Sequence, residues 1–136
     1  MRRVRAAVLL AALAAVTLAH AGPASVALSG RVRGASGAHP VYVALWQREG
    51  FLERPARQTR FTPGAAPDFR FDVPPGAWAL SAFEDKNDNG VLDMGLFGPK
   101  EPSGFWRPFT AWRRPKFDDV AATVTHDSAG ADITLK

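Results

Sequence analysis

The segment from Asp85 to Asp93 carries an oxygen-bearing side chain at nearly every second position. It reads D-K-N-D-N-G-V-L-D, and with Asp85 as position 1 it follows the pattern of an EF-hand-type calcium loop. A loop of this kind curls around the ion and presents alternate residues to it, because Ca²⁺ takes about six to eight oxygen ligands. The spacing therefore predicts a Ca²⁺ site made by the side chains of Asp85, Asn87, Asn89 and Asp93 and the backbone carbonyl of Val91.

The remaining positions of the loop qualify this prediction. Gly90 stands at position 6, where the backbone must turn sharply, and Asp88 stands at an even position and should point away from the ion. Position 12 is Leu96, where an EF-hand has a glutamate, so another carboxylate must substitute, and Glu101 is the nearest one downstream. The alternative is an Asx-rich turn that binds its own backbone and needs no metal. With two certain carboxylates, the expected dissociation constant is about 10⁻⁴–10⁻³ M, as in extracellular modules.

A second segment with possible chemistry runs from 104 to 117 and reads G-F-W-R-P-F-T-A-W-R-R-P-K-F. Aromatic rings beside cations can stack on sugar rings or bind a carboxylated ligand, so this segment could bind a carbohydrate or another small ligand. The residues that we single out for such contacts are Trp106, Arg107, Trp112 and Arg113. The alternative is that four aromatic residues roof the open end of the fold, with the arginines in solvent: Phe105, Trp106, Phe109 and Phe117.

The sequence offers little that indicates catalysis. There is no cysteine, which excludes thiol nucleophiles and Cys-type zinc sites, and no serine stands in a G-x-S-x-G motif. His39 and His126 have no second ligand at metal spacing, and His20 belongs to the N-terminal segment discussed below. We therefore expect a protein that is not an enzyme, with a hydrolase as the least favoured alternative.

Short apolar runs separated by proline and glycine favour strands over long helices. In the run 69–73, Phe69, Phe71 and Val73 alternate with polar residues, and the run 40–47 is apolar on both faces, as expected of a central strand. The pattern predicts an all-β fold, an antiparallel β-sandwich of about seven strands, at 25–33, 40–47, 58–62, 69–73, 77–84, 119–125 and 131–135. The last two are expected to pair as a hairpin.

The first 21 residues have the organisation of a signal peptide. Basic residues are followed by an apolar run of about a dozen residues and by small residues at Ala19 and Ala21. We expect cleavage after Ala21, a single domain at 22–136, and a periplasmic or extracellular location. The alternative is an uncleaved anchor, although the apolar run is shorter than the roughly 20 residues that span a bilayer.

Charge limits the partners of the chain. Three of its 17 basic residues lie in the predicted signal, so the mature chain has 14 basic and 13 acidic residues. This near balance disfavours nucleic-acid binding, which requires an excess of Lys and Arg. After signal cleavage no integral membrane protein is expected. A glycan or another envelope protein is a possible partner.

Five short motifs resemble, in order, those of the bacterial domain of unknown function 2141 family. They are Val43-Ala44-Leu45-Trp46, Pro74-Pro75-Gly76-Ala77-Trp78-Ala79, the loop 85–93, the run from Gly98 to Phe105, and Pro115-Lys116-Phe117-Asp118-Asp119. The resemblance implies an exported sandwich of immunoglobulin-like or prealbumin-like type with no established activity. Glu84 departs from the pattern, which has a histidine or similar polar residue before the loop.

From these observations we expect an exported, non-catalytic binding or interaction module, stabilised by a calcium ion in the 85–93 loop. The alternative is a carbohydrate or small-ligand binder that uses the segment 104–117.

Overall fold

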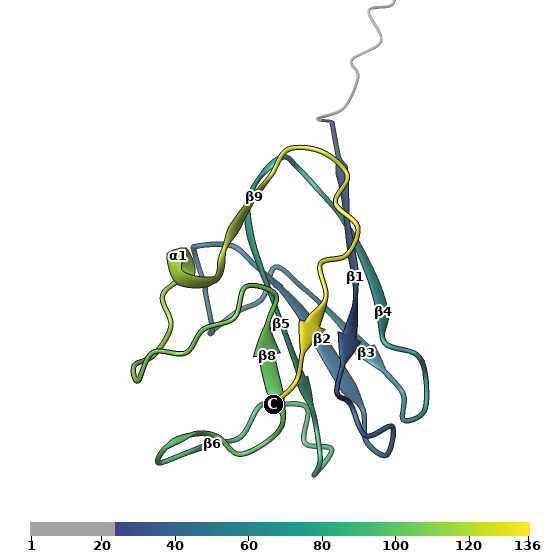
Figure 1. The fold of residues 1–136 in the computed structure, drawn as a ribbon, viewed down its shortest axis with the longest axis vertical. Helices are drawn as coiled ribbons and strands as arrows, with labels where there is room; N and C mark the ends of the chain where they lie inside the picture. Colours follow the sequence, from purple (N-terminus) through teal and green to yellow (C-terminus); the bar gives the residue numbers. More distant parts are fainter. Residues whose placement is uncertain (1–23) are drawn as a thin grey trace, which may run out of the picture.

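The computed structural model describes residues 24–136, so the predicted signal peptide at 1–21 and its cleavage site lie outside the described residues (Figure 1). The chain forms short strands and one helical turn. In order they are β1 (Val26–Arg33), β2 (Val41–Trp46), β3 (Arg57–Phe61), β4 (Asp68–Val73), β5 (Gly76–Glu84), β6 (Met94–Gly95), β7 (Gly98–Pro99), β8 (Ser103–Phe105), α1 (Phe117–Val120), β9 (Ala122–Val124) and β10 (Ile133–Thr134).

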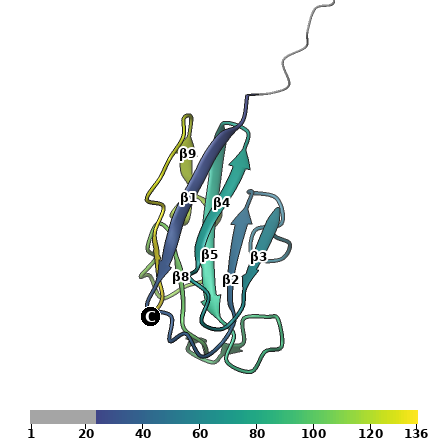
Figure 2. The same ribbon diagram turned by 90° about the vertical axis from the view of Figure 1, so that its right-hand side faces the viewer.

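The strands form two main sheets that pack face to face, and the predicted all-β sandwich is confirmed. One sheet has the order β10-β1-β4 and the other the order β3-β2-β5-β8, with β9 also paired to β5. Figure 2 shows β1 and β4 lying in front of β5 and β2. All pairings between named strands are antiparallel except that of β1 with β10. The small hairpin of β6 and β7 stands apart from both sheets.

The main core fills the space between the sheets. Alternate residues of β2 and β4 point into it, which is why Val43 and Leu45 are buried together with Phe69, Phe71 and Val73. The period of two in these strands therefore identified the core face as predicted.

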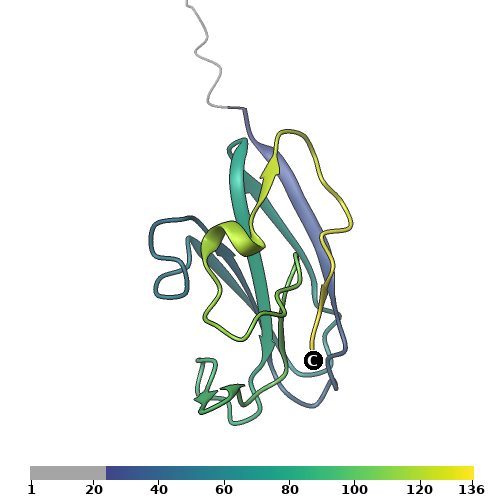
Figure 3. The same cartoon turned by 60° about the vertical axis from the view of Figure 1, so that its left-hand side comes forward.

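A second apolar cluster covers the outer face of β2 and β5. Ala44, Trp46 and Ala79 contribute from the sheet, and Phe117 and Val120 from α1, which lies over β5 in Figure 3. This explains why β2 is apolar on both faces. Both clusters are built within residues 26–135, so the described part of the chain contains its own core.

The predicted hairpin of 119–125 with 131–135 is wrong. Phe117 and Val120 are buried at helical spacing in α1, β9 pairs with β5, and β10 runs parallel to β1 in the opposite sheet. The crossing segment is fixed to β1 by side chains, because Asp127 accepts the Ala27 N–H at 2.8 Å and Asp132 accepts the Arg31 N–H at 3.0 Å. Local pattern contains no information on such long-range partners.

Strands β6, β7 and β8 contain only two or three residues each, too few for an alternating pattern to be detected in the sequence. Residues 24–136 therefore contain more strands than the seven predicted. Within residues 24–136 the structure has no helix with the length and apolar character needed to cross a membrane.

Candidate functional site

The 85–93 loop leaves the end of β5, where the strand places Asp85 in the protein interior. Its side chain is 0% exposed, and its backbone N–H donates to the carbonyl of Pro40 at 2.8 Å. The Asp85 carboxylate turns into the loop and accepts the Gly90 N–H at 2.7 Å and the Asn89 N–H at 3.3 Å. The carboxylate at position 1 is therefore hydrogen-bonded to positions 5 and 6 and holds the loop in a curl.

Two residues provide the left-handed backbone that this curl needs. Gly90 has a φ of 78° and Asp88 a φ of 54°. Glycine adopts this conformation without steric cost and aspartate tolerates it better than most residues. The Asp88 side chain is 68% exposed and lies 3.5 Å from the Arg60 guanidinium. It points to solvent, as its even position in the loop predicted.

Three of the predicted ligands converge on one another. The Asn87 amide nitrogen lies 2.6 Å from one Asp93 oxygen, and the Asn89 amide nitrogen lies 3.1 Å from both. A 180° turn of either amide exchanges its nitrogen for its oxygen without moving the side chain. Positions 3 and 5 of the loop thus both contact the carboxylate at position 9.

Glu101 closes the loop from outside the 85–93 segment. It is 7% exposed, and its two carboxylate oxygens accept the Lys86 N–H at 2.9 Å and the Asp93 N–H at 3.2 Å. The carboxylate expected to replace position 12 therefore does reach the loop. Its contacts are to backbone N–H groups at positions 2 and 9, so it fastens the two ends of the loop together.

Two further observations bear on whether the loop is a calcium site or an Asx-rich turn. The Val91 N–H donates to the Asn89 side-chain oxygen at 3.1 Å, a contact typical of an Asx turn. Within residues 24–136 no three His, Asp or Glu side chains gather closely enough to hold a metal ion by themselves. A cation here would depend on amide and carbonyl oxygens in addition to the two aspartates.

An open depression of about 400 Å³ lies beside the loop. It is lined by Lys86, Asn87, Asp93, Met94, Lys100 and Glu101. The two lysines oppose the negative charge of the loop, which reduces its attraction for a cation. Tyr42, the only tyrosine of the chain, reaches the loop on another side, since its hydroxyl would lie 3.8 Å from a Cβ placed on Gly90.

Glu84 is a buried carboxylate to which sequence reasoning gave no role. It is 1% exposed, it accepts the Ser36 N–H at 2.9 Å, and it also accepts a hydrogen bond from the Ser36 hydroxyl. Burial works to raise the pKa of Glu84, but these two hydrogen bonds, together with the charges of His39 and Lys86, outweigh it and hold the pKa below its usual value. Glu84 therefore anchors the turn after β1 to the end of β5. The sequence feature that could have indicated this role is a carboxylate at the end of a mostly apolar strand.

The aromatic and basic segment 104–117 is largely used for packing. Trp106 is half-buried against the main core, and Phe105 and Phe109 pack against the second cluster, as the roof interpretation predicted. The Arg107 guanidinium donates to the carbonyl of Ala121 at 2.6 Å. Two of the four residues proposed for ligand contacts, Trp106 and Arg107, therefore support the fold.

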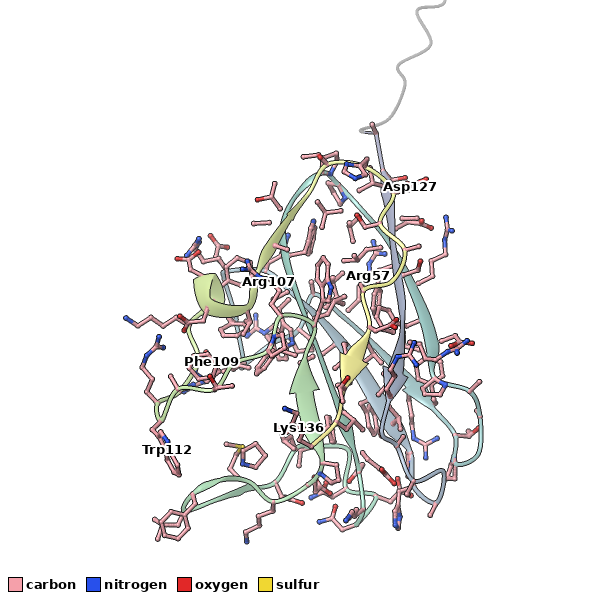
Figure 4. All side chains as sticks on the ribbon, viewed as in Figure 1. Arg57, Arg107, Phe109, Trp112, Asp127 and Lys136 are labelled. Atoms are coloured by element: carbon pink, nitrogen blue, oxygen red, sulfur yellow. The ribbon has the colours of Figure 1, made fainter. Side chains whose placement is uncertain are left out.

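Arg113 and Trp112 are adjacent in the sequence, but Arg113 is held by contacts with the fold whereas Trp112 is exposed. Arg113 binds the Asp119 carboxylate through two nitrogens at 2.7 and 2.9 Å and lies 5.1 Å from the centre of the Phe109 ring. The Arg113 hydrogen bond, together with one from the Lys116 N–H, lowers the pKa of Asp119 to about 2. Trp112 is 96% exposed, and in Figure 4 its side chain extends from its loop toward the β6–β7 hairpin.

Comparison with known proteins identifies a family. Residues 32–131, well over half of the chain, match the family described as an uncharacterized protein conserved in bacteria, DUF2141. No curated protein and no solved structure shows significant similarity to the chain.

Proposed function

We propose that this chain, which belongs to the DUF2141 family, is an exported, non-catalytic binding module whose 85–93 loop binds Ca²⁺. The ligands would be side-chain oxygens of Asp85, Asn87, Asn89 and Asp93 and the Val91 carbonyl. Export would depend on residues 1–21, and the module would act in the periplasm or outside the cell, where calcium is abundant.

The observation that carries the proposal is the meeting of positions 3, 5 and 9. The Asn87 and Asn89 amide nitrogens lie 2.6 and 3.1 Å from the Asp93 carboxylate, although both asparagines are exposed enough to turn to solvent. In a plain Asx turn these side chains need only bind neighbouring backbone groups. Their convergence on one carboxylate brings three of the proposed ligands together, as an ion held by the loop requires.

The Asp85 contacts support the same proposal. A buried carboxylate is costly unless its oxygens are satisfied. The Asp85 carboxylate accepts hydrogen bonds from two backbone N–H groups, and each of its oxygens can accept a second partner. A cation on the inner side would use this remaining capacity.

The charge balance predicts weak binding. Asp85 and Asp93 supply two negative charges, and Lys86 and Lys100 line the adjoining depression. Low ligand charge places calcium affinity in the range of extracellular modules, about 10⁻⁴–10⁻³ M.

Non-catalytic function is the best-supported choice because the buried carboxylates already have structural roles. Glu84, Asp85 and Glu101 each accept hydrogen bonds that hold backbone segments in place. A general acid or base must instead be free to contact a substrate proton.

Terbium luminescence tests the proposal directly. Tb³⁺ substitutes for Ca²⁺ and emits when a nearby aromatic residue absorbs, and Tyr42 lies next to Gly90. We expect saturable emission that Ca²⁺ reverses at millimolar concentration. Tyr42→Phe should dim the emission without changing the Ca²⁺ concentration needed for reversal.

The loop variants complete the experiment. Asp85→Asn combined with Asp93→Asn should abolish the saturable emission, whereas Asp118→Asn, on the exposed start of α1, should leave it unchanged. Emission that persists in the loop variant, or no saturable emission in the natural chain, would contradict calcium binding at this loop.

A further inference from the structure

The large apolar side chains that the described residues expose are concentrated in one stretch of the chain. Leu96 and Phe97, at the tip of the β6–β7 hairpin, are 91% and 89% exposed, and Met94 is 62% exposed. Trp112, in the loop before α1, is 96% exposed. Soluble proteins rarely expose several large apolar residues together unless these residues form a contact surface.

The two segments lie on the same side of the molecule. In Figures 1 and 3 the β6–β7 hairpin and the loop that precedes α1 both project from the side of β5 that faces away from β1 and β4. In Figure 4 the Trp112 side chain extends from its loop toward the hairpin. The exposed rings thus belong to two neighbouring projections and not to a flat face.

Positive charge surrounds these projections. Most arginines of the sandwich are paired with aspartates, whereas Lys86, Lys100, Arg114 and Lys116 are exposed and take part in none of the ion pairs found within residues 24–136.

The acidic groups on this side are only partly neutralised. Asp118 and Asp119 pair with Arg48 and Arg113, whereas Asp93 and Glu101 lie beside Lys86 and Lys100 around the same depression. Arg114 and Lys116, which follow Trp112 in the chain, are therefore the exposed cations outside ion pairs that lie apart from this acidic depression.

We propose that the β6–β7 hairpin and the Trp112 loop dock onto a membrane surface that contains anionic lipids. Leu96, Phe97 and Trp112 would enter the interface between headgroups and acyl chains, where tryptophan is favoured. Lysine and arginine at the base of the projections would face the lipid phosphates.

The shape of the surface favours a lipid occupant over a second protein. A protein partner needs a contiguous, complementary area, whereas a bilayer accepts separate side chains that project from loop tips. The combination of fully exposed apolar tips and unpaired cations is complementary to an anionic bilayer in both polarity and charge. The proposal is independent of calcium binding, and its test is carried out in chelator.

Vesicle binding tests the proposal with residues 24–136, which contain both apolar clusters and exclude the predicted signal. We expect sedimentation with vesicles of 30% phosphatidylglycerol in phosphatidylcholine, and binding at least about tenfold weaker to pure phosphatidylcholine. Binding should also weaken as salt is raised. Brominated lipids should quench the fluorescence of Trp112, and Trp112→Phe should remove most of that quenching.

Matched variants separate the two contributions. Leu96→Ser with Phe97→Ser should weaken binding about tenfold or more through lost apolar contact. Lys100→Glu with Arg114→Glu should do the same through charge. Arg70→Glu, on the exposed face of β4 in the opposite sheet, should change binding by less than about twofold.

Several results would overturn the proposal. They are equal binding to neutral and anionic vesicles, no binding to either, and loop variants that bind as well as the natural chain. Concentration-dependent dimerisation that disappears in the Leu96 and Phe97 variant would instead assign the surface to a second copy of the chain. Failure of vesicle binding would leave the calcium proposal untouched, because the two are measured separately.

Discussion

The 85–93 loop and the 104–117 segment both contain side chains suited to binding, but the fold uses them in opposite ways. In the loop, Asp85 and Asn89 bind backbone groups a few residues away, so the chemistry is built from local contacts. In the segment, Phe109 and Arg113 are drawn into contacts with α1 and the second cluster. Polar residues at short, regular spacing keep their arrangement, whereas aromatic residues near an uncovered sheet face become part of the core.

Within the 104–117 segment, removing a packed aromatic ring should destabilise the protein far more than removing an exposed one. Phe117 is 5% exposed and contacts the Phe51 ring edge to face at 5.8 Å, so Phe117→Ala should lower the free energy of unfolding by about 3–5 kcal/mol. Trp112→Ala, with its ring in solvent, should change it by less than about 0.5 kcal/mol. Chemical denaturation measures both, and similar losses for the two variants would refute the division between packed and free rings.

The structural role of the loop can be measured without any metal. Asp85→Asn removes a buried charged acceptor of two backbone N–H groups, so in chelator it should lower the free energy of unfolding by about 2 kcal/mol. Asp88→Asn is the control, because asparagine also tolerates the left-handed backbone and the side chain is exposed. A harmless Asp85→Asn would mean that the carboxylate does not hold the curl.

The ion pair of Arg113 with Asp119 should give a smaller, pH-dependent effect. Folding lowers the pKa of Asp119 from 3.8 to about 2, so its stabilising contribution is complete above pH 3.8 and is lost as the pH falls through about 2. Asp119→Asn should therefore lower the melting temperature at pH 7, and the difference should vanish near pH 2. NMR titration of the Asp119 carboxyl group provides a second readout, and a midpoint near 3.8 would show that the pair is not formed.

The sequence predicted what depends on local pattern. Alternation located β1, β2, β4 and β5, and the spacing of Asp85, Asn87 and Asn89 placed them in one curled loop.

Long-range partners were not predictable in the same way. The sequence named Glu101 as the nearest downstream carboxylate, but not its backbone N–H partners. Those contacts depend on the β6–β7 hairpin, which folds back so that the Lys100 N–H donates to the Asp93 carbonyl at 2.8 Å. Gly30 lies inside β1, where glycine usually weakens a strand, yet a Cβ there would lie 2.4 Å from the Ala131 carbonyl oxygen of the crossing segment. The residue that requires glycine at this position is therefore about a hundred residues away in the chain.

The most direct test of the central claim is thermal unfolding in millimolar Ca²⁺ and in chelator. Because Ca²⁺ would bind the folded loop, calcium at ten times the dissociation constant should add about 1.4 kcal/mol and raise the melting temperature by a few degrees. Mg²⁺ should do much less, since it prefers a smaller shell and retains its waters. Asp85→Asn with Asp93→Asn should remove the calcium effect. Identical melting curves for the natural chain in calcium and in chelator would contradict the account and leave the loop as an Asx-rich turn.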